Sequence, residues 1–184
     1  MSDPVSVSLA ARVYSSVHLT GEFTLRLGGT STEFFDHCSF QSEPALLREI
    51  AENLAPLMPA DAEVVAGPEL GGVPIATMLS QVVNLPAAWV RKKAKDYGPR
   101  KLVEGAEVAG RRVIVVEPFV KTGNFAVGLC ADLRGLGAHI VGVLCVIDFQ
   151  RGGPERLAAA GYKFSALFTL GEAADAYAQS HVHR

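Results

Sequence analysis

The sequence predicts an α/β fold, with a central, mostly parallel sheet flanked by helices. Short runs rich in β-branched residues recur along the chain, and segments with a helical spacing of apolar residues separate most of them. This alternation is typical of parallel strands joined by crossover helices that cover the sheet. The predicted strands are EVVAG (63–67), AAWV (87–90), RRVIVV (111–116), HIVGVLCVID (139–148) and SALFTL (165–170).

The N-terminal part of the chain predicts a small module ahead of this sheet. Its first element is a weakly amphipathic segment at about residues 10–17, and residues 22–36 indicate two short strands around a Gly28-Gly29 turn. A chain of 184 residues is most simply one domain. We therefore expect a single domain over residues 1–184, with the module at about 1–40 and the core at about 41–184.

Four helices are predicted between the strands from apolar spacing and from residues that start or stop helices. In the first, apolar residues recur at helical spacing until a proline ends the pattern. Proline suits the first turn of a helix, and asparagine and serine suit the N-cap. The start and stop signals are Ser42 and Pro59, Pro74, Asn124 and Gly135, and Pro154 and Gly161.

Composition excludes several classes of protein. With 49% hydrophobic residues, 20% charged residues and a formal charge of -2, the chain shows neither the signature of disorder nor a bulk attraction to nucleic acid. No apolar run reaches the roughly 18 residues of a membrane-spanning helix. Cys38, Cys130 and Cys145 lack metal-ligand spacing and indicate buried thiols in a reducing compartment. We expect a soluble, cytoplasmic protein whose partners include no nucleic acid and no membrane.

Polar loops follow three predicted strands, at the carboxyl ends where ligands bind in open α/β sheets. The first, GPELGG (67–72), has glycines that let the backbone approach a ligand, although a tight turn without a ligand explains it equally well. The second, RKKAKDYGPRK (91–101), sets six basic side chains against Asp96. This segment is either a solvated face or a binding site for a polyphosphate. The second alternative follows because concentrated like charges repel one another unless an anion is present.

The third loop follows the strand 111–116, which delivers Glu117 at its end. KTGN (121–124) then leads into a helix, whose first N–H groups bind phosphate well, and Thr122 and Asn124 add side-chain donors. The loop is not a Walker A motif, because GxxxxGK[ST] is absent. The chain also has no GxGxxG, so a dinucleotide-binding fold is not indicated.

Together these segments resemble the orotate phosphoribosyltransferases, which have the type I phosphoribosyltransferase fold. GEFTLRLGGTSTEFFD (21–36) resembles the family's N-terminal hood over the base, and GPELGGVPIA (67–76) its pyrophosphate loop. RKKAKDYG (91–98) resembles its mobile catalytic loop and is the most family-specific segment. VIVVEPFVKTGN (113–124) resembles the strand and loop that bind phosphoribosyl pyrophosphate (PRPP).

The resemblance implies transfer of ribose 5-phosphate from Mg²⁺-bound PRPP to orotate or a related heterocycle, with release of pyrophosphate. Mg²⁺ is expected mainly through PRPP, and the 91–101 loop is expected to reach the neighbouring site of a homodimer. Phe34 and Phe35 could equally be core residues. The resemblance assigns catalysis to Lys95, Asp96 and Arg91; PRPP and pyrophosphate binding to Glu69, Gly71, Gly72, Arg91, Lys92, Lys95, Glu117, Lys121, Thr122, Gly123 and Asn124; and base binding to Arg26, Phe34, Phe35 and Phe149.

Three residues depart from the family pattern. Pro118 replaces the second of two adjacent acids and offers neither a carboxylate nor an N–H group. Tyr97 stands where the catalytic loop usually has histidine, and its phenol titrates near pH 10. Phe149 stands where an arginine usually meets the orotate carboxylate, a role that Arg151 could take instead. Lys121, by contrast, adds a charge to the phosphate loop.

Three functions remain open on the sequence. The first is an enzyme that acts on orotate or a related heterocycle, supported by the basic loop and the pyrophosphate loop. The second is a catalytically weakened relative that senses PRPP or a nucleotide, favoured by Pro118, Tyr97 and Phe149. The third, a pure dimerisation scaffold, is hard to reconcile with so many basic residues.

Overall fold

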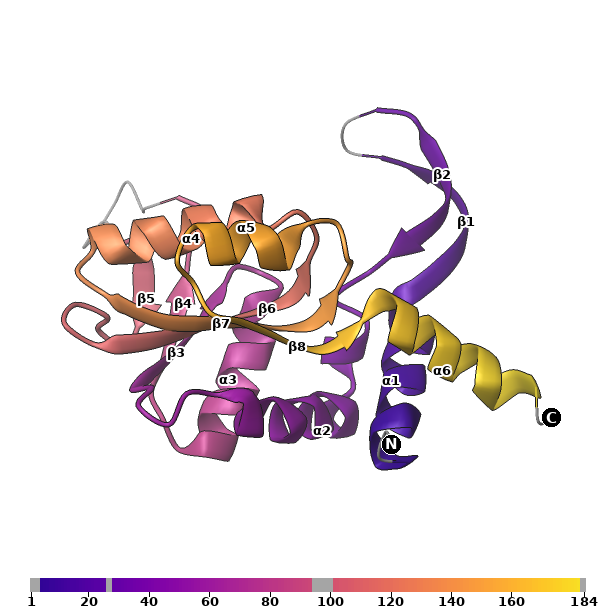
Figure 1. The fold of residues 1–184 in the computed structure, drawn as a ribbon, viewed down its shortest axis with the longest axis horizontal. Helices are drawn as coiled ribbons and strands as arrows, with labels where there is room; N and C mark the ends of the chain where they lie inside the picture. The colour runs from indigo at the N-terminus through magenta and orange to yellow at the C-terminus, as the bar shows by residue number, and fades with distance from the viewer. Residues whose placement is uncertain (1–3, 26–27, 94–100, 183–184) are drawn as a thin grey trace.

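The core of the molecule is a six-stranded sheet in the order β5-β4-β3-β6-β7-β8 (Figure 1). The computed structural model describes residues 4–25, 28–93 and 101–182. Neighbouring strands run parallel except at the edge, where β4 and β5 are antiparallel. The predicted α/β class with a mostly parallel central sheet is confirmed. The strands are β3 (Val64–Pro68), β4 (Ala87–Val90), β5 (Val103–Gly105), β6 (Arg112–Val120), β7 (His139–Asp148) and β8 (Phe164–Thr169).

Helices cover both faces of this sheet, with α4 and α5 on one face and α2 and α3 on the other (Figure 1). Because successive side chains of a strand point to opposite faces, each face has its own hydrophobic cluster. Val65 and Ile114 belong to the cluster that includes Ile75, and Val113 to the cluster that includes Leu133. The helices are α2 (Pro44–Leu54), α3 (Gly72–Val83), α4 (Asn124–Gly135) and α5 (Gly153–Ala159), and short 3-10 turns span Phe40–Ser42 and Ala55–Leu57.

A two-stranded antiparallel hairpin of β1 (His18–Thr24) and β2 (Thr30–Phe35) projects from the body of the molecule (Figure 1). Its turn requires glycine, because Gly28 and Gly29 have φ angles of 92° and 83°. The hairpin follows α1 (Pro4–Val17), and α1 packs along α6 (Leu170–Val182), the last helix. The predicted pair of strands around Gly28-Gly29 is confirmed. The C-terminal helix α6 packs against α1 of the N-terminal module.

Several element boundaries differ from the prediction. α2 begins after Glu43 rather than Ser42, because Ser42 belongs to a 3-10 turn. α3 begins at Gly72, ahead of Pro74. Asn124 is the first residue of α4 and not its cap, which is Gly123 in a left-handed conformation with φ 75°. β5 and α6 were not predicted at all. No helix in the described ranges is long and apolar enough to cross a membrane.

β6 is longer than predicted, since it continues to Val120 instead of ending at Val116. The pairing explains how a strand can contain Pro118. β3 pairs with β6 only as far as Val115, whereas β7 pairs with it from Arg112 to Val120. The missing N–H of Pro118 therefore falls where β6 has lost one neighbour, the position at which sheets tolerate proline. The extension carries Glu117 and Phe119 past the last residue of β6 that pairs with β3, to the place where the site lies.

Candidate active site

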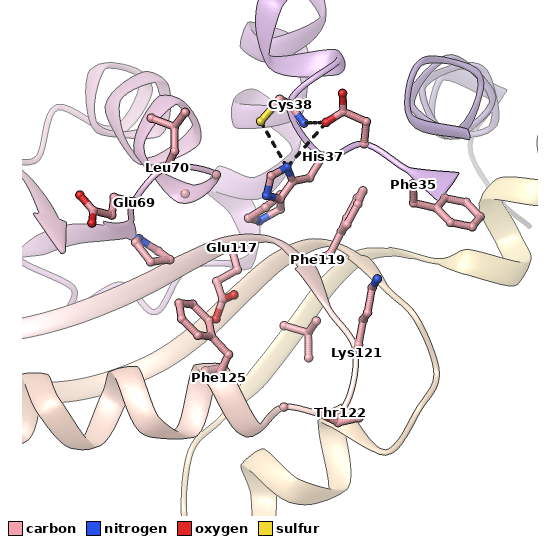
Figure 2. A pocket seen from close by; sticks show the side chains of 18 of the residues that line it. Phe35, His37, Cys38, Glu69, Leu70, Glu117, Phe119, Lys121, Thr122 and Phe125 are labelled. Atoms are coloured by element: carbon pink, nitrogen blue, oxygen red, sulfur yellow. Dashed lines mark hydrogen bonds and ion pairs between the residues drawn. The ribbon is translucent and has the colours of Figure 1, made fainter. Parts of the chain in front are cut away.

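A cavity of about 630 Å³ opens at the carboxyl ends of β3 and β6 (Figure 2). The loop after β3, the end of β6 and the start of α4 form its walls, and the residues that follow β2 close it from the hairpin side. A second cavity of about 280 Å³ adjoins it and shares Pro68, Glu69, Lys92 and Phe125 with it. Segments far apart in the sequence thus meet at the carboxyl ends of the strands, where ligands of such sheets bind.

Most predicted site residues within the described ranges line these two cavities. Arg91 and Asn124 line the second, and Phe149 lines neither. Arg26, Lys95, Asp96 and the altered Tyr97 lie outside the described residues. The predicted residues that line the first cavity are Phe34, Phe35, Glu69, Gly71, Gly72, Lys92, Glu117, Lys121, Thr122 and Gly123.

The glycines of the 67–72 loop are required by close packing. A Cβ atom on Gly67 would overlap the carbonyl group of Gly72, and one on Gly72 would overlap the Pro68 ring and lie 2.8 Å from the carbonyl oxygen of Val116. A Cβ atom on Gly71 would lie 2.9 Å from Nε2 of His37. The loop therefore passes close to β6 and to the end of the hairpin with no room for a side chain at these three glycines, and its backbone forms part of the cavity wall there.

Glu69 connects this loop to the beginning of the basic segment. Its backbone N–H donates to the carbonyl oxygen of Val90 over 2.7 Å, and its carboxylate accepts the backbone N–H of Lys92 over 2.8 Å. The N–H of Arg91 donates to Leu102 over 2.9 Å, so the two ends of the 91–101 segment are held side by side. Within the described residues, the buried Nε of Arg91 has no hydrogen-bond partner, which leaves a cationic donor available in the second cavity.

Glu117 is a buried carboxyl group in the wall of the cavity. Its side chain is 6% exposed and lies beside the Phe125 ring (Figure 2). Its Oε1 atom has no hydrogen-bond partner among the described residues. Burial raises the pKa of Glu117 to about 8, because a carboxylate loses its hydration there. A buried polar atom without a partner is costly, so this group is suited to ligand hydroxyls or to a ligand-borne cation.

The raised pKa of Glu117 predicts a specific pH dependence of folding stability. Between the ordinary pKa of 4.5 and the folded value of about 8, the unfolded chain loses this proton and the folded chain keeps it. The free energy of unfolding should therefore fall as pH rises through this range, by at most about 1.4 kcal/mol per pH unit. Glu117→Gln removes this titration. Urea unfolding of both proteins at pH 5, 6.5 and 8 measures it, and a difference between them that does not change with pH would refute it.

The loop at 121–124 leads directly into the first turn of α4, whose N–H groups lack helical acceptors. Gly123 has φ 75°, and an added Cβ atom would lie 3.0 Å from the carbonyl oxygen of Gly153, so the turn needs glycine. Thr122 and Asn124 are exposed on it. Such a helix start binds phosphate oxygens well. The Lys121 side chain does not point toward this helix start. Its Nζ lies 4.7 Å from the ring centroid of Phe149, and the side chain extends away from Thr122 (Figure 2).

The comparisons with known proteins agree with this geometry. A family model described as the phosphoribosyl transferase domain matches residues 39–164. The orotate phosphoribosyltransferase of Nocardioides sp. (strain ATCC BAA-499 / JS614) is 42% identical over 168 residues, which cover 91% of this chain and 94% of that protein. This chain belongs to the orotate phosphoribosyltransferase family.

Further relatives support the same membership. The orotate phosphoribosyltransferase of Methanocella arvoryzae is 38% identical and covers 83% of this chain and 87% of its own length. Among solved structures, the Mycobacterium tuberculosis orotate phosphoribosyltransferase in complex with Fe(III) dicitrate has a TM-score of 0.81, 31% identity, and coverage of 92% of this chain and 99% of that chain. The same enzyme in complex with PRPP has a TM-score of 0.79, 28% identity, and coverage of 93% and 99%.

Two of the three residues that depart from the orotate phosphoribosyltransferase pattern, Pro118 and Phe149, lie within the described part of the chain. Pro118 is buried, and its ring lies 3.1 Å from where a Cβ atom on Gly71 would stand, so it packs under the 67–72 loop. Phe149 is 5% exposed and lies behind the cavity wall. Its ring centroid is 5.2 Å from that of Phe35 and 5.0 Å from that of Phe119. Phe35 also packs on the hydrophobic core, while Phe34 is 41% exposed.

Sequence reasoning missed the residues that immediately follow the hairpin. Asp36, His37 and Cys38 line the first cavity, and their potential ligand atoms lie within 4.8 Å of one another. Nδ1 of His37 lies 3.3 Å from Sγ of Cys38, and Asp36 accepts the backbone N–H of Cys38 over 2.9 Å. Burial lowers the pKa of His37 despite the opposing effect of Asp36. The expectation of a buried thiol holds for Cys130 and Cys145 but was wrong for Cys38, which is half-buried at the cavity.

Leu70, Phe119 and Phe125 were also missed. They line the first cavity, and Leu70 and Phe125 are 68% and 55% exposed. The only signal in the sequence is that each lies within or beside a predicted loop.

Proposed function

We propose that this family member transfers the ribose 5-phosphate group of PRPP to orotate in pyrimidine nucleotide synthesis. A ring nitrogen of orotate forms a bond to carbon 1 of the ribose, and the bond from carbon 1 to the pyrophosphate oxygen breaks with both electrons leaving on pyrophosphate. The nitrogen's proton passes to solvent or to Asp96. The observation that carries this proposal is the single cavity that joins the Gly71-Gly72 loop, the carboxyl of Glu117 and the Thr122-Gly123 turn.

The cavity offers a place for each part of PRPP. The 5′-phosphate would bind at Thr122, Gly123 and Asn124, where the first turn of α4 supplies N–H groups. The pyrophosphate would bind along the Gly71-Gly72 backbone and the basic side chains that follow β4. Arg91 supports this assignment, because a buried guanidinium nitrogen with no partner among the described residues is suited to an anion.

Glu117 would hold the ribose hydroxyls, and PRPP would arrive as its Mg²⁺ complex. The donor set fits a hard cation brought by the substrate, since carboxylates of Asp36, Glu69 and Glu117 line the same cavity. Bound in this way, Mg²⁺ would neutralise charge on the departing pyrophosphate. The protein's own contribution is to orient both reactants and to exclude water from carbon 1.

The base would bind between the hairpin and the end of β6. Phe34, Phe35 and Phe119 line this side of the cavity, and Phe149 supports it from behind. Arg26 would complete the base site from the hairpin. We place the enzyme in the cytoplasm, in keeping with its three free thiols, and as a homodimer in which the 91–101 segment reaches the neighbouring site.

One observation favours a second function, a sensor of PRPP. Pro118 leaves Glu117 as a lone acid, so the ribose has one carboxylate contact fewer than the family pattern provides. Incubation with PRPP, Mg²⁺ and a panel of bases, with pyrophosphate release as the readout, separates the two functions. Pyrophosphate release is expected when orotate is the base. Saturable PRPP binding without release for any base would instead establish the sensor, and release with another base alone would establish a retuned transferase.

A further inference from the structure

Lys121 places a cation at the edge of an aromatic cluster and away from the phosphate loop. Its Nζ lies 4.7 Å from the ring centroid of Phe149, and that ring contacts the rings of Phe35 and Phe119. In Figure 2 the side chain rises beside Phe119, on the opposite side of its own backbone from Thr122. Phe35, Phe119 and Lys121 all line the first cavity. The ammonium group is therefore directed toward the aromatic end of this cavity.

The surroundings of Lys121 favour an anionic ligand. Burial lowers its pKa, and the nearby charge of Arg151 lowers it further. Lys121 in turn contributes to the lowered pKa of His37, after the larger effect of burial. No carboxylate among the described residues forms an ion pair with Lys121, and Asp36 already accepts the backbone N–H of Cys38. Lys121 is exposed as a residue, but its ammonium group stands over the Phe149 ring without a carboxylate partner among the described residues, and an anion brought by a ligand is favourable in that position.

The aromatic rings identify which part of the ligand carries that anion. A 5′-phosphate would lie at the Thr122-Gly123 turn, from which the amine points away. Phenyl rings bind a planar heterocycle through its faces and edges, whereas they offer no partner to a charged substituent on it. A lysine at the edge of the rings supplies that partner through a charge-assisted hydrogen bond.

We propose that Lys121 is the specificity residue that selects a base with a ring carboxylate, and that it pairs with this carboxylate instead of with the 5′-phosphate. This inference rests on the proposed function, because the carboxylate is that of orotate. Phe35 and Phe119 hold the plane of the ring, with Phe149 packed behind them, and the ammonium group distinguishes the anionic base from its neutral analogue.

Equilibrium binding of two nucleotides tests this role without requiring turnover. Orotidine and uridine 5′-monophosphates share the phosphate, ribose and pyrimidine ring and differ only in the carboxylate. The wild-type protein should prefer the orotidine nucleotide by roughly 10- to 100-fold, the usual effect of a charged hydrogen bond. Lys121→Met should reduce this preference to about threefold or less, and Lys121→Arg should retain most of it. Lys163→Met, at an exposed lysine that precedes β8 at the opposite end of the sheet, should leave it unchanged.

Three outcomes would overturn the assignment. Equal weakening of both nucleotides by Lys121→Met would place the amine on the 5′-phosphate. An unchanged preference in that variant would place carboxylate recognition elsewhere, and a wild-type protein without a preference would show that no such recognition exists. The proposed function fails separately, through a lack of pyrophosphate release with orotate. An active enzyme with an unaltered preference in Lys121→Met would keep the function and lose only the role of Lys121.

Discussion

Replacing Gly72 with alanine is expected to lower kcat/KM for PRPP by about 100-fold or more, since displacing a positioned loop by about an ångström has an effect of this size. The added methyl group would overlap the Pro68 ring and the carbonyl oxygen of Val116, and both are held in place by the sheet. The loop must therefore move out of the cavity wall. Overpacking of this kind should also lower the free energy of unfolding by roughly 1–3 kcal/mol. Steady-state kinetics and urea unfolding measure the two effects.

Gly135→Ala is the matched control for this substitution. Gly135 ends α4, and nothing lies within 4 Å of the position of an added Cβ atom. Activity should be unchanged, and stability should be equal or slightly higher because alanine favours the helix over glycine. A Gly72→Ala protein that binds and uses PRPP as well as the wild type would contradict the tight packing of the 67–72 loop.

Lys95→Ala is expected to lower kcat by about 100- to 1000-fold, the usual effect of removing a group that stabilises developing transition-state charge. Lys95 itself lies outside the described residues, but the structure shows where its segment begins and ends. Arg91 and Leu102 are hydrogen-bonded at the carboxyl end of β4, beside the cavity. The charge is needed most as pyrophosphate leaves, so PRPP affinity should change much less than kcat.

Lys93→Ala provides the comparison within the same basic segment, because Lys93 is exposed and has no proposed contact with the substrate. Its effect on kcat should stay below about tenfold, as for an exposed charge that solvent and salt screen. PRPP affinity, measured by calorimetry, should remain similar in the wild-type, Lys95→Ala and Lys93→Ala proteins. Turnover that is insensitive to Lys95→Ala, or equally sensitive to Lys93→Ala, would refute the role assigned to Lys95.

The sequence carried strong signals for the parallel sheet. Runs such as 87–90 and 139–148 became β4 and β7 with the predicted bounds, because buried parallel strands need uninterrupted β-branched and apolar residues. β5 and α6 left weaker signals. β5 is a three-residue edge strand inside a polar segment, and its formation depends on pairing with β4. α6 starts where β8 ends, with no loop between them to mark its start.

The candidate site was predicted where a loop carries its own chemistry, and missed where folding brings distant residues together. The glycines at 71–72 and the Thr122-Gly123 turn could be recognised from their local pattern. His37 enters the cavity only because the chain after β2 returns over β3 and β6, a long-range arrangement that no local pattern encodes. The direction of the Lys121 side chain likewise depends on the aromatic rings beside it, which come from three separate elements.

The most direct test of the proposed transfer is to identify and quantify the products formed from orotate and PRPP in the presence of Mg²⁺. Mass spectrometry should show orotidine 5′-monophosphate, in an amount equal to the pyrophosphate released. Omission of either substrate should abolish both products. Saturable binding of PRPP with no nucleotide product from orotate would contradict the proposed reaction.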